Sequence, residues 1–302
     1  MQVSTGATSA NTSNIAAQSV EAESSSTEDG SVSGSLLGNL RFISLESIVR
    51  QEGVEKIRSE NIAREIKQDG ILRHPIYVTR LDSRLFTSFD GHNRIDAFNR
   101  LGYSAILGQL IPFEYIIPGT WLQVADASPR NFSESLKRLG LMVKPISSPQ
   151  ANVDQRDLVA TVFSKHSCFT IHNDSPPEII KDTSRVVQTL AEITFNGIER
   201  FTDAEMLSVL KRLDDRIAVR FPTFTPQQVV EAVRCGEQVG AGVTRWEFRD
   251  RIINVNMPLG AWLNRPVEEL NSKLRAAIAS GRTRPYCSHI TEAEVKWDDF
   301  LR

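Results

Sequence analysis

Asp90-Gly91-His92-Asn93-Arg94 separates two short segments whose side-chain patterns differ. Residues 85–89 read Leu-Phe-Thr-Ser-Phe and alternate in side-chain direction, which predicts a strand. Residues 92–101 place their apolar side chains close to one face, which predicts a helix, and Gly102 supplies its stop. The stretch therefore predicts a strand, a tight turn and a helix N-terminus, where free backbone N–H groups and the helix dipole favour an anion such as phosphate.

Each residue of this turn has a chemical task open to it. Gly91 has no side chain and lets a ligand approach the backbone. His92 and Arg94 offer hydrogen-bond donors, and the planar fork of Arg94 suits phosphate oxygens. Asp90 has a carboxylate for a divalent cation or for a helix cap. The alternative is that Asp-Gly only makes a turn and that His92 and Arg94 are ordinary surface residues, and the five residues alone do not decide between these interpretations.

Composition limits the kind of protein that this chain can be. A chain of 302 residues with 40% hydrophobic and 24% charged residues is typical of a soluble protein with one large core or two modest domains. Its net charge of −2 lacks the basic excess of a protein whose main partner is nucleic acid. Cys168, Cys235 and Cys287 are far apart and show no CxxC spacing, which argues against a disulfide framework and against a zinc site.

The first 36 residues differ in composition from the rest of the chain. They are rich in Ser, Thr, Ala, Asn and Glu, contain no Lys or Arg, and lack the apolar run of a secretory signal. Such a segment cannot bury enough surface to offset its ordering entropy, so we expect it to be disordered. No stretch of the chain approaches the roughly 20 apolar residues that cross a bilayer, and we expect a cytoplasmic protein without a membrane partner.

Residues 37–120 are expected to form a first domain of mixed sheet and short helices. Its predicted strands are 41–45, 76–79, 85–89 and 105–115, the middle two forming a hairpin, and its predicted helices are 59–68 and 92–101. Residues 121–302 are expected to form a helix-rich second domain that completes the site. Its predicted helices are 131–140, 175–190, 202–213, 225–236 and 266–279, and its predicted strands are 168–171, 217–221 and 252–256. The predicted fold class is α/β, of the α+β kind.

Six blocks of the sequence together resemble one fold family. They are, in order, Arg50-Gln51-Glu52, Arg58, residues 69–76, Asp90 to Arg94 with Ala97 and Leu101-Gly102, residues 242–245 and residues 256–259. This pattern is similar to the ParB/sulfiredoxin fold and, within that fold, to the free L-serine kinases of the SerK/SbnI type. The resemblance extends over about residues 40–118 and, in patches, over about 220–262.

The resemblance implies a kinase that transfers a phosphoryl group from ADP or ATP to the hydroxyl of free L-serine and gives O-phospho-L-serine. Its implied ligands are an adenine nucleotide, L-serine and Mg²⁺. Its implied partner is a downstream pyridoxal-phosphate enzyme, in cysteine or in diaminopropionate and siderophore-type biosynthesis. By analogy, Glu52 is the general base, Asp90 and His92 lie at the reacting centre, and Asp90 holds the magnesium ion.

The same analogy implies roles for two further groups of residues. The residues implied to bind the nucleotide are Arg73, Gly91, His92, Asn93 and Arg94. The residues implied to line the serine pocket are Trp121, Thr244, Arg245 and Trp246. A substrate carboxylate needs a planar fork of donors, which the guanidinium group of Arg245 has.

Structural alternatives stay open for several of these residues. Glu52 fits a solvated acid in a Gln-Glu-Gly turn, Trp121 fits a core aromatic, and Arg245 fits a strand with a surface ion pair. Two positions also depart from the pattern, since related kinases usually have histidine where this chain has Asn93 and Trp246. An indole adds bulk and a single donor, which bears on the choice between serine and a related hydroxylated amino acid.

Other occupants of the same fold have their own sequence signatures. A ParB-type protein that binds CTP and DNA carries a Gly-Glu-Arg-Arg-like box, a helix-turn-helix and a basic face, and none of these is evident in the sequence. Sulfiredoxin chemistry needs a cysteine inside the phosphate turn, where this chain has His92-Asn93. A ParB-like nucleotide-binding regulatory or DNA-binding protein without kinase activity is the alternative function, and an assay separates it from a kinase.

Overall fold

The computed structural model describes residues 36–147, 157–173, 179–194, 196–279, 281–287, 290–297 and residue 300. All the helices and strands described below belong to the unit Val32–Arg302. The segment predicted to be disordered lies outside the described residues, except for its last residue, Leu36. Within the described ranges, no helix is both long and apolar enough to cross a membrane.

Five strands form the first sheet, in the spatial order β1-β6-β4-β5-β2. They are β1 (Leu40–Ser44), β2 (Ile48–Arg50), β4 (Ile76–Arg80), β5 (Phe86–Asp90) and β6 (Ala105–Leu110). The predicted hairpin is confirmed, because β4 and β5 pair antiparallel. β2 runs parallel to β5, with Arg50 opposite Ser88. Because the two strands run in the same direction, Glu52 and Asp90, two residues further on, reach the same edge of the sheet.

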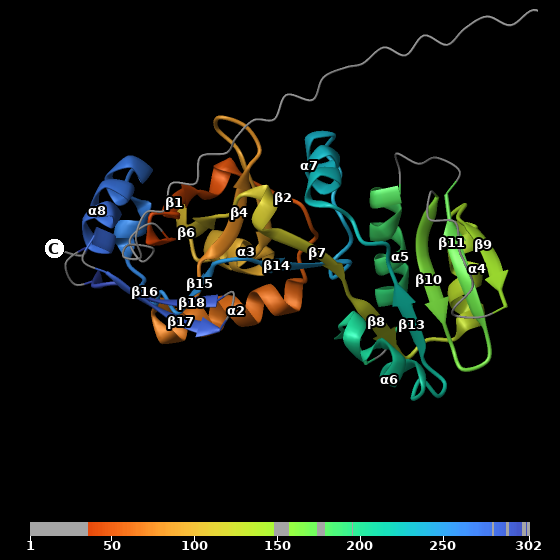
Figure 1. Cartoon of the computed structure of the whole chain (residues 1–302). Coiled ribbons are helices and arrows are strands. Elements are labelled where there is room, and N and C mark those ends of the chain that lie inside the picture. Colours follow the sequence, from red (N-terminus) through yellow and green to blue (C-terminus); the bar gives the residue numbers. More distant parts are fainter. Residues whose placement is uncertain are drawn as a thin grey trace, which may run out of the picture. The chain divides into compact units, whose positions relative to one another are not determined.

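Two helices, α2 (Lys56–Asp69) and α3 (His92–Arg100), pack against each other beside this sheet (Figure 1). α2 ends where Gly70 takes a left-handed conformation and donates its N–H to the carbonyl of Ile66. α3 follows Gly91 and buries Ile95, Ala97 and Phe98 on one face. The helices predicted at 59–68 and 92–101 are therefore confirmed.

Six strands form the second sheet, in the order β12-β8-β13-β10-β11-β9, and each pairs antiparallel with its neighbours. They are β8 (Leu122–Ala125), β9 (Met142–Ile146), β10 (Leu158–Phe163), β11 (Cys168–His172), β12 (Ile198–Phe201) and β13 (Ile217–Arg220). Helices accompany this sheet: α4 (Pro129–Arg138), α5 (Ile179–Ile193), α6 (Met206–Leu210) and α7 (Pro226–Arg234). This part of the chain thus holds more strand than the predicted helix-rich domain, within a fold of the predicted mixed class.

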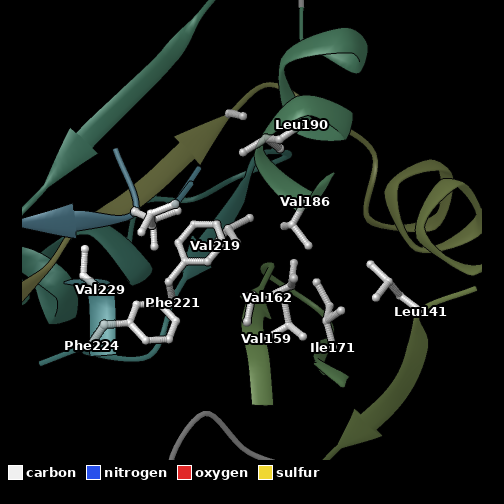
Figure 2. Close-up of a cluster of buried hydrophobic side chains, with 14 of the residues drawn as sticks. Leu141, Val159, Val162, Ile171, Val186, Leu190, Val219, Phe221, Phe224 and Val229 are labelled. Atoms are coloured by element: carbon white, nitrogen blue, oxygen red, sulfur yellow. The ribbon is translucent and has the colours of Figure 1, made fainter. Parts of the chain in front are cut away.

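Helix α5 covers the second sheet with an apolar face. Val186 and Leu190 of α5 belong to the same buried cluster as Val162 of β10 and Val219 of β13 (Figure 2). All four side chains are fully buried, and each contributes about 1.5–3 kcal/mol relative to an exposed position. This apolar layer stabilises the second sheet, of which β12 is an edge strand.

The helices predicted to start at residues 202 and 225 begin with capping boxes, and the helix predicted to start at 131 begins earlier. Thr225 and Gln228 form a capping box at α7, and Thr202 and Glu205 form one ahead of α6. At α4 the cap is Ser128, whose hydroxyl accepts the N–H of Asn131, so the helix begins at Pro129, ahead of the start predicted at residue 131. The next residue, Pro129, sets the first helical position, which explains the earlier start.

The chain beyond residue 243 forms two small two-stranded sheets with segments from the first half of the chain. β14 (Thr244–Phe248) pairs with β7 (Ile116–Thr120), and β16 (Met257–Pro258) pairs with β3 (Ile71–Leu72). The remaining elements are β15 (Arg251–Ile253), α8 (Val267–Ala279), β17 (Arg282–Cys287) and β18 (Ile290–Glu294), with short 3-10 turns at Leu45–Ser47, Phe113–Tyr115, Asp203–Glu205 and Ala261–Asn264.

Residues from this last segment share a core with the first sheet. Ile252, Met257, Leu270 and Leu274 are buried in one cluster with residues of β1, β4 and β6. The side chain of Asn271 in α8 also accepts the N–H of Phe42, at 2.8 Å, and donates to its carbonyl, at 2.9 Å. The predicted division at residue 120 stays a prediction, and the first sheet draws part of its core from beyond residue 250.

Candidate functional site

A cavity of about 920 Å³ is lined by residues from both sheets and from the loops around them. The lining residues include Glu52, Glu55 and Arg58 before and in α2, residues 89–94 around the β5–α3 turn, Ile198 and Arg200 of β12, Gly242, residues 244–248 of β14, Arg251, Ile117 and Trp121. Every predicted site residue except Arg73 is among them. The structure therefore brings together side chains that lie up to about 200 residues apart in the sequence.

The turn between β5 and α3 can only be built with glycine at position 91. Gly91 has a φ of +106°, and a Cβ atom there would lie 2.6 Å from the Cγ2 atom of Ile76. Arg94, one turn into α3, donates from Nη1 to the carbonyl of His74 at 2.9 Å and also to that of Pro75. These contacts hold the guanidinium group of Arg94 beside the turn, at the positive end of the helix.

Asp90 lies between two arginines. Its Oδ1 is 3.3 Å from Nη2 of Arg94, and its Oδ2 is 3.2 Å from Nη2 of Arg251. Burial opposes ionisation, but Arg94, Arg251 and smaller effects that include the N–H of Gly91 together hold the pKa of the Asp90 carboxyl below its usual range. Asp90 is therefore a carboxylate at neutral pH. Arg251, which also lies over the ring of Tyr77 at 4.6 Å, was not predicted, because no motif surrounds it in the sequence.

His92 is buried and neutral. Burial lowers its pKa to about 4, although Asp90 and the carbonyl of Ser88 act in the opposite direction. Its Nε2 lies 2.9 Å from that carbonyl, and because a carbonyl only accepts, Nε2 carries the proton. This tautomer leaves Nδ1 as an acceptor, so the ring does not offer the free donor that the sequence suggested.

Glu52 is held by two donors from the segment before and in β14. Its Oε1 accepts the N–H of Gly242 at 2.5 Å, and its Oε2 accepts the hydroxyl of Thr244 at 3.2 Å. Burial raises the pKa of Glu52 to about 7, against the opposing effects of Gly242, the charge of Arg200 and Thr244. A carboxyl group with a pKa near neutrality in a cavity has the properties of a general base.

Asn93 connects the phosphate turn with the loop that carries Glu52. Its Oδ1 accepts the backbone N–H of Glu55 at 3.2 Å. The carboxylate of Glu55 in turn lies 2.6 Å from Nη2 of Arg200. Glu55 and Arg200 were both missed from the sequence, since a lone acid near a helix start and a lone arginine in a short strand carry no motif.

The predicted substrate-pocket residues lie along β14 and at the end of β7. Arg245 stacks over the ring of Trp121 at 5.3 Å and forms an ion pair with Glu247, the pair that the structural alternative expected. Trp246 meets the ring of Phe89 edge to face at 4.9 Å. Its indole Nε1 is buried and has no hydrogen-bond partner among the described residues. The indole of Trp246 forms part of the cavity wall, and a buried N–H without a partner is uncommon in folded proteins.

Arg73 lies away from this cavity. It follows the short strand β3, and its guanidinium group forms an ion pair with Asp69 at 2.7 Å on the protein surface. Its backbone carbonyl accepts the N–H of Asn256, which fixes the segment against β16. The structure does not bring Arg73 to the phosphate turn, because the pairing of β3 with β16 places it outside the lining.

Asp90 is the carboxylate of the Asp90–Arg94 turn. It would be the single protein ligand that this turn offers to a metal ion. In the parts of the chain that the structure describes, no cluster of three or more His, Cys, Asp or Glu side chains gathers in metal-binding geometry. Magnesium often binds through one or two carboxylates while phosphate and water oxygens fill its other positions. The donor set therefore suits a magnesium ion that arrives with a nucleotide, and not a resident all-protein site.

No family model matches the sequence, and no curated protein matches it. Solved structures match it in three dimensions. SbnI with a C-terminal truncation, from Staphylococcus aureus, gives a TM-score of 0.62 at 21% identity, over 78% of this chain and 95% of that chain. Free serine kinase in complex with AMP gives 0.63 at 18% identity, over 73% of this chain and 92% of that chain. The chain has the fold of SbnI and of free serine kinase.

Two further structures agree with these matches. A mutant free serine kinase in complex with ADP gives a TM-score of 0.63 at 18% identity, over 73% of this chain and 92% of that chain. A conserved hypothetical protein from Pyrococcus furiosus gives 0.60 at 17% identity, over 73% of this chain and 95% of that chain. The predicted resemblance is thus confirmed for the fold, and the activity has to be argued from the side chains of the cavity.

Proposed function

We propose that this protein is a free L-serine kinase that uses ADP or ATP and gives O-phospho-L-serine. The observation that carries the proposal is Glu52, whose pKa of about 7 suits a base, in one cavity with the Asp90–Arg94 turn. The fold adds support, since free serine kinase has been solved with AMP and its mutant with ADP. A phosphate-binding turn beside a base fits phosphoryl transfer to a hydroxyl group.

The nucleotide phosphates are proposed to lie at the N-terminus of α3. There the backbone N–H groups after Gly91, the helix dipole and the guanidinium groups of Arg94 and Arg251 favour negative charge. Asn93 braces this turn through Glu55, and His92 stays neutral beneath it. Asp90 would bind a magnesium ion together with phosphate oxygens of the nucleotide. When bound, the ion would neutralise charge on the transferred group.

The acceptor hydroxyl is proposed to lie between the nucleotide and Glu52. Its oxygen bonds to the terminal phosphorus, the bond from that phosphorus to the leaving nucleotide oxygen breaks, and the hydroxyl proton passes to Glu52. With ADP as the donor the nucleotide product is AMP, and with ATP it is ADP. A base in hydrogen-bond reach typically contributes about 10²- to 10⁴-fold, and the remaining acceleration comes from alignment and charge neutralisation.

The amino-acid part of the substrate is proposed to contact the segment 244–246 and Trp121. Arg245 has a fork for the α-carboxylate, provided that it exchanges its pairing with Glu247. Thr244 keeps Glu52 in place, and the free indole N–H of Trp246 meets a polar atom of the substrate. The product would feed a cytoplasmic pyridoxal-phosphate enzyme, in cysteine or diaminopropionate and siderophore-type biosynthesis.

The test is to incubate the protein with L-serine, Mg²⁺ and ADP or ATP and to follow O-phosphoserine by ³¹P NMR. Glu52→Gln should lower kcat by about 10²- to 10⁴-fold, whereas Glu46→Gln, at an exposed acid outside the cavity, should not change it. The wild-type kcat/KM should rise with pH through about 7 and level off above it, because Glu52 acts when ionised.

Two results would contradict the proposal. Nucleotide binding without product under every condition would favour the regulatory protein that binds nucleotide and lacks kinase activity. Product formation that is unchanged in Glu52→Gln would leave a kinase but remove Glu52 as its base.

A further inference from the structure

Arg200 is a cavity residue to which no role has been given so far. It lies in the edge strand β12 of the second sheet and reaches the loop that follows β2, where its Nη2 is 2.6 Å from Oε1 of Glu55. Only 21% of its side chain is exposed, and its buried Nε has no hydrogen-bond partner among the described residues. This guanidinium group is partly buried and is compensated by Glu55, because burying a charge without a partner is costly.

Arg200 also packs on the glycine that holds Glu52. Gly242 has a φ of +71°, and a Cβ atom at this position would lie 2.1 Å from Nε of Arg200 and 2.4 Å from its Cζ. The guanidinium group therefore occupies the space that any other residue would need for its side chain. The N–H of Gly242 donates to Oε1 of Glu52 at 2.5 Å, so Arg200, Gly242 and Glu52 form consecutive contacts.

The same arginine joins the Glu52 loop to the phosphate turn. Its partner Glu55 donates its backbone N–H to Asn93, inside the turn between β5 and α3. Gln123, opposite Arg200 in the β8–β12 pairing, donates its side-chain amide to the carbonyls of Ala241 and Gly242. Arg200 thus lies where three segments meet, those of the base, the phosphate turn and the 240–244 loop.

We infer that Arg200 is a positioning residue for Glu52, since its guanidinium group clamps Gly242 and Glu55 around the Glu52 carboxylate and keeps that carboxylate beside Thr244. The inference rests on the proposed function, in which Glu52 takes the proton of the acceptor hydroxyl. Arg200 itself is not required to touch the substrate. Its effect passes through Glu52.

Several charged groups face Glu52 and have to be considered together. Arg200 lowers the pKa of Glu52 and Glu55 raises it, both less strongly than burial does. The same cavity is also lined by the titratable groups of Arg58, Asp90, His92, Arg94, Arg245, Glu247 and Arg251. A smaller cavity of about 260 Å³ that Glu52 also lines has Arg50, Lys56, Asp96 and Arg100 around it. Arg50 and Arg100 are neutralised in part by Asp96, at 3.4 and 2.7 Å. Among the cations, Arg200 has the largest effect on the pKa of Glu52.

The first experiment does not depend on catalysis. The full chain is labelled with ¹³C at the glutamate carboxyl groups, and the Glu52 signal is identified by its loss in Glu52→Gln. In Arg200→Gln the titration midpoint of Glu52 should move up by about one pH unit, the low end of the effect of a nearby opposite charge. Arg220→Gln is the matched control: this arginine pairs with Asp203 outside the cavity and should leave the midpoint unchanged.

A second arm separates position from charge. Arg200→Lys keeps a positive charge but lacks the planar group that spans Gly242 and Glu55. Its Glu52 midpoint should stay within a few tenths of a unit of the wild type, while kcat at pH 9, where Glu52 is ionised in all variants, should fall about tenfold with KM for the nucleotide unchanged. Gly242→Ala, which displaces Arg200 by its added Cβ, should give the same loss of kcat.

Defined results would overturn the inference. A Glu52 midpoint that is the same in Arg200→Gln and the wild type, with the circular dichroism of a folded chain, would exclude an effect of Arg200 on Glu52. Full kcat at pH 9 in both Arg200→Lys and Gly242→Ala would exclude a positioning role. If the wild type forms no O-phosphoserine, the kinase proposal fails, and the titration still decides whether Arg200 acts on Glu52.

Discussion

Glu52 has two properties: its carboxylate accepts hydrogen bonds from two donors, and its pKa lies near neutrality. The hydrogen bonds from Gly242 and Thr244 favour the ionised form, whereas burial favours the protonated one. Burial is the larger effect, so the pKa rises to about 7. The alternative of a solvated acid in a turn does not fit a carboxylate with these partners.

We predict that Glu52→Gln changes how the stability of the protein depends on pH. The folded pKa of about 7 lies above the ordinary value of 4.5, so the folded state binds more protons between these values. The contribution of Glu52 to stability is therefore full below about pH 4.5 and is lost as the pH rises through about 7. Urea unfolding at a series of pH values should show the wild type losing stability relative to Glu52→Gln over this range. Parallel curves for the two proteins would mean an ordinary pKa in the folded state.

A second prediction concerns the unpaired indole N–H of Trp246. Trp246→Phe keeps an aromatic ring against Phe89 and removes the donor, so the KM for L-serine should rise roughly threefold to tenfold, the value of one neutral hydrogen bond. Trp262→Phe is the control, since Trp262 packs in the core beside Phe42 and does not line the cavity. An unchanged KM would show that the indole N–H does not meet the substrate.

Sequence patterns predicted some of these residues and missed others for a physical reason. The Asp90–Arg94 turn could be predicted because a strand, a glycine and a helix follow one another within a few residues. Glu55, Arg200 and Arg251 could not, since their positions depend on pairing between segments more than 100 residues apart. Arg73 was assigned to the nucleotide by analogy alone, without a local pattern around it. The pairing of β3 with β16 places it outside the cavity lining.

The turn between β5 and α3 depends on one glycine, and a matched comparison can test it. Gly91 and Gly102 both have positive φ values, +106° and +76°, but only Gly91 has a neighbour within 4 Å of an added Cβ. Gly91→Ala should therefore weaken nucleotide binding by tenfold or more, because the turn has to shift away from Ile76. Gly102→Ala should cost about 1 kcal/mol in unfolding free energy and leave nucleotide affinity unchanged. Calorimetric titration with ADP measures the first effect, and equal affinities in both variants would contradict it.

The strands β10, β14 and β7 escaped prediction for different reasons. β10 is buried at five of its six positions, so its sequence Leu-Val-Ala-Thr-Val-Phe shows no alternation of polar and apolar residues. β14 contains Arg245, Trp246 and Glu247, whose polarity suggests a surface segment, and its partner β7 holds a proline and a glycine. The helices that were predicted carry caps and amphipathic periods, which are local signals.

The first sheet depends on a segment that comes late in the chain. α8 packs on β1, and its Asn271 satisfies the N–H and the carbonyl of Phe42 at the edge of the sheet. Arg251 in β15, immediately before this segment's buried residues, contacts Asp90 in the cavity. One stretch of sequence therefore supplies both buried residues of the first sheet's core and the arginine that pairs with Asp90.

We predict that removing a buried side chain from α8 also destabilises the first sheet. Leu274→Ala should lower the unfolding free energy by about 2–5 kcal/mol, because this side chain is fully buried in the shared core. Hydrogen exchange should show reduced protection of β1 and β6 as well as of α8. Lys273→Ala, on the neighbouring partly exposed position, should change stability by less than about 0.5 kcal/mol. Loss of protection confined to α8 would mean that the helix folds independently of the sheet.

Phe42 and Asn271 are separated by 229 residues, and this distance has a consequence for synthesis of the protein. During translation β2, which precedes Glu52, and β5, which ends at Asp90, leave the ribosome long before the segment around Asn271 that packs on the first sheet. A nascent chain would then expose the apolar face of β1 and β6 until the residues of α8 have been made, and closing so long a loop is slow. Such a chain would fold late and all at once, and its expression would be more sensitive to chaperone supply and to premature termination than its length alone suggests.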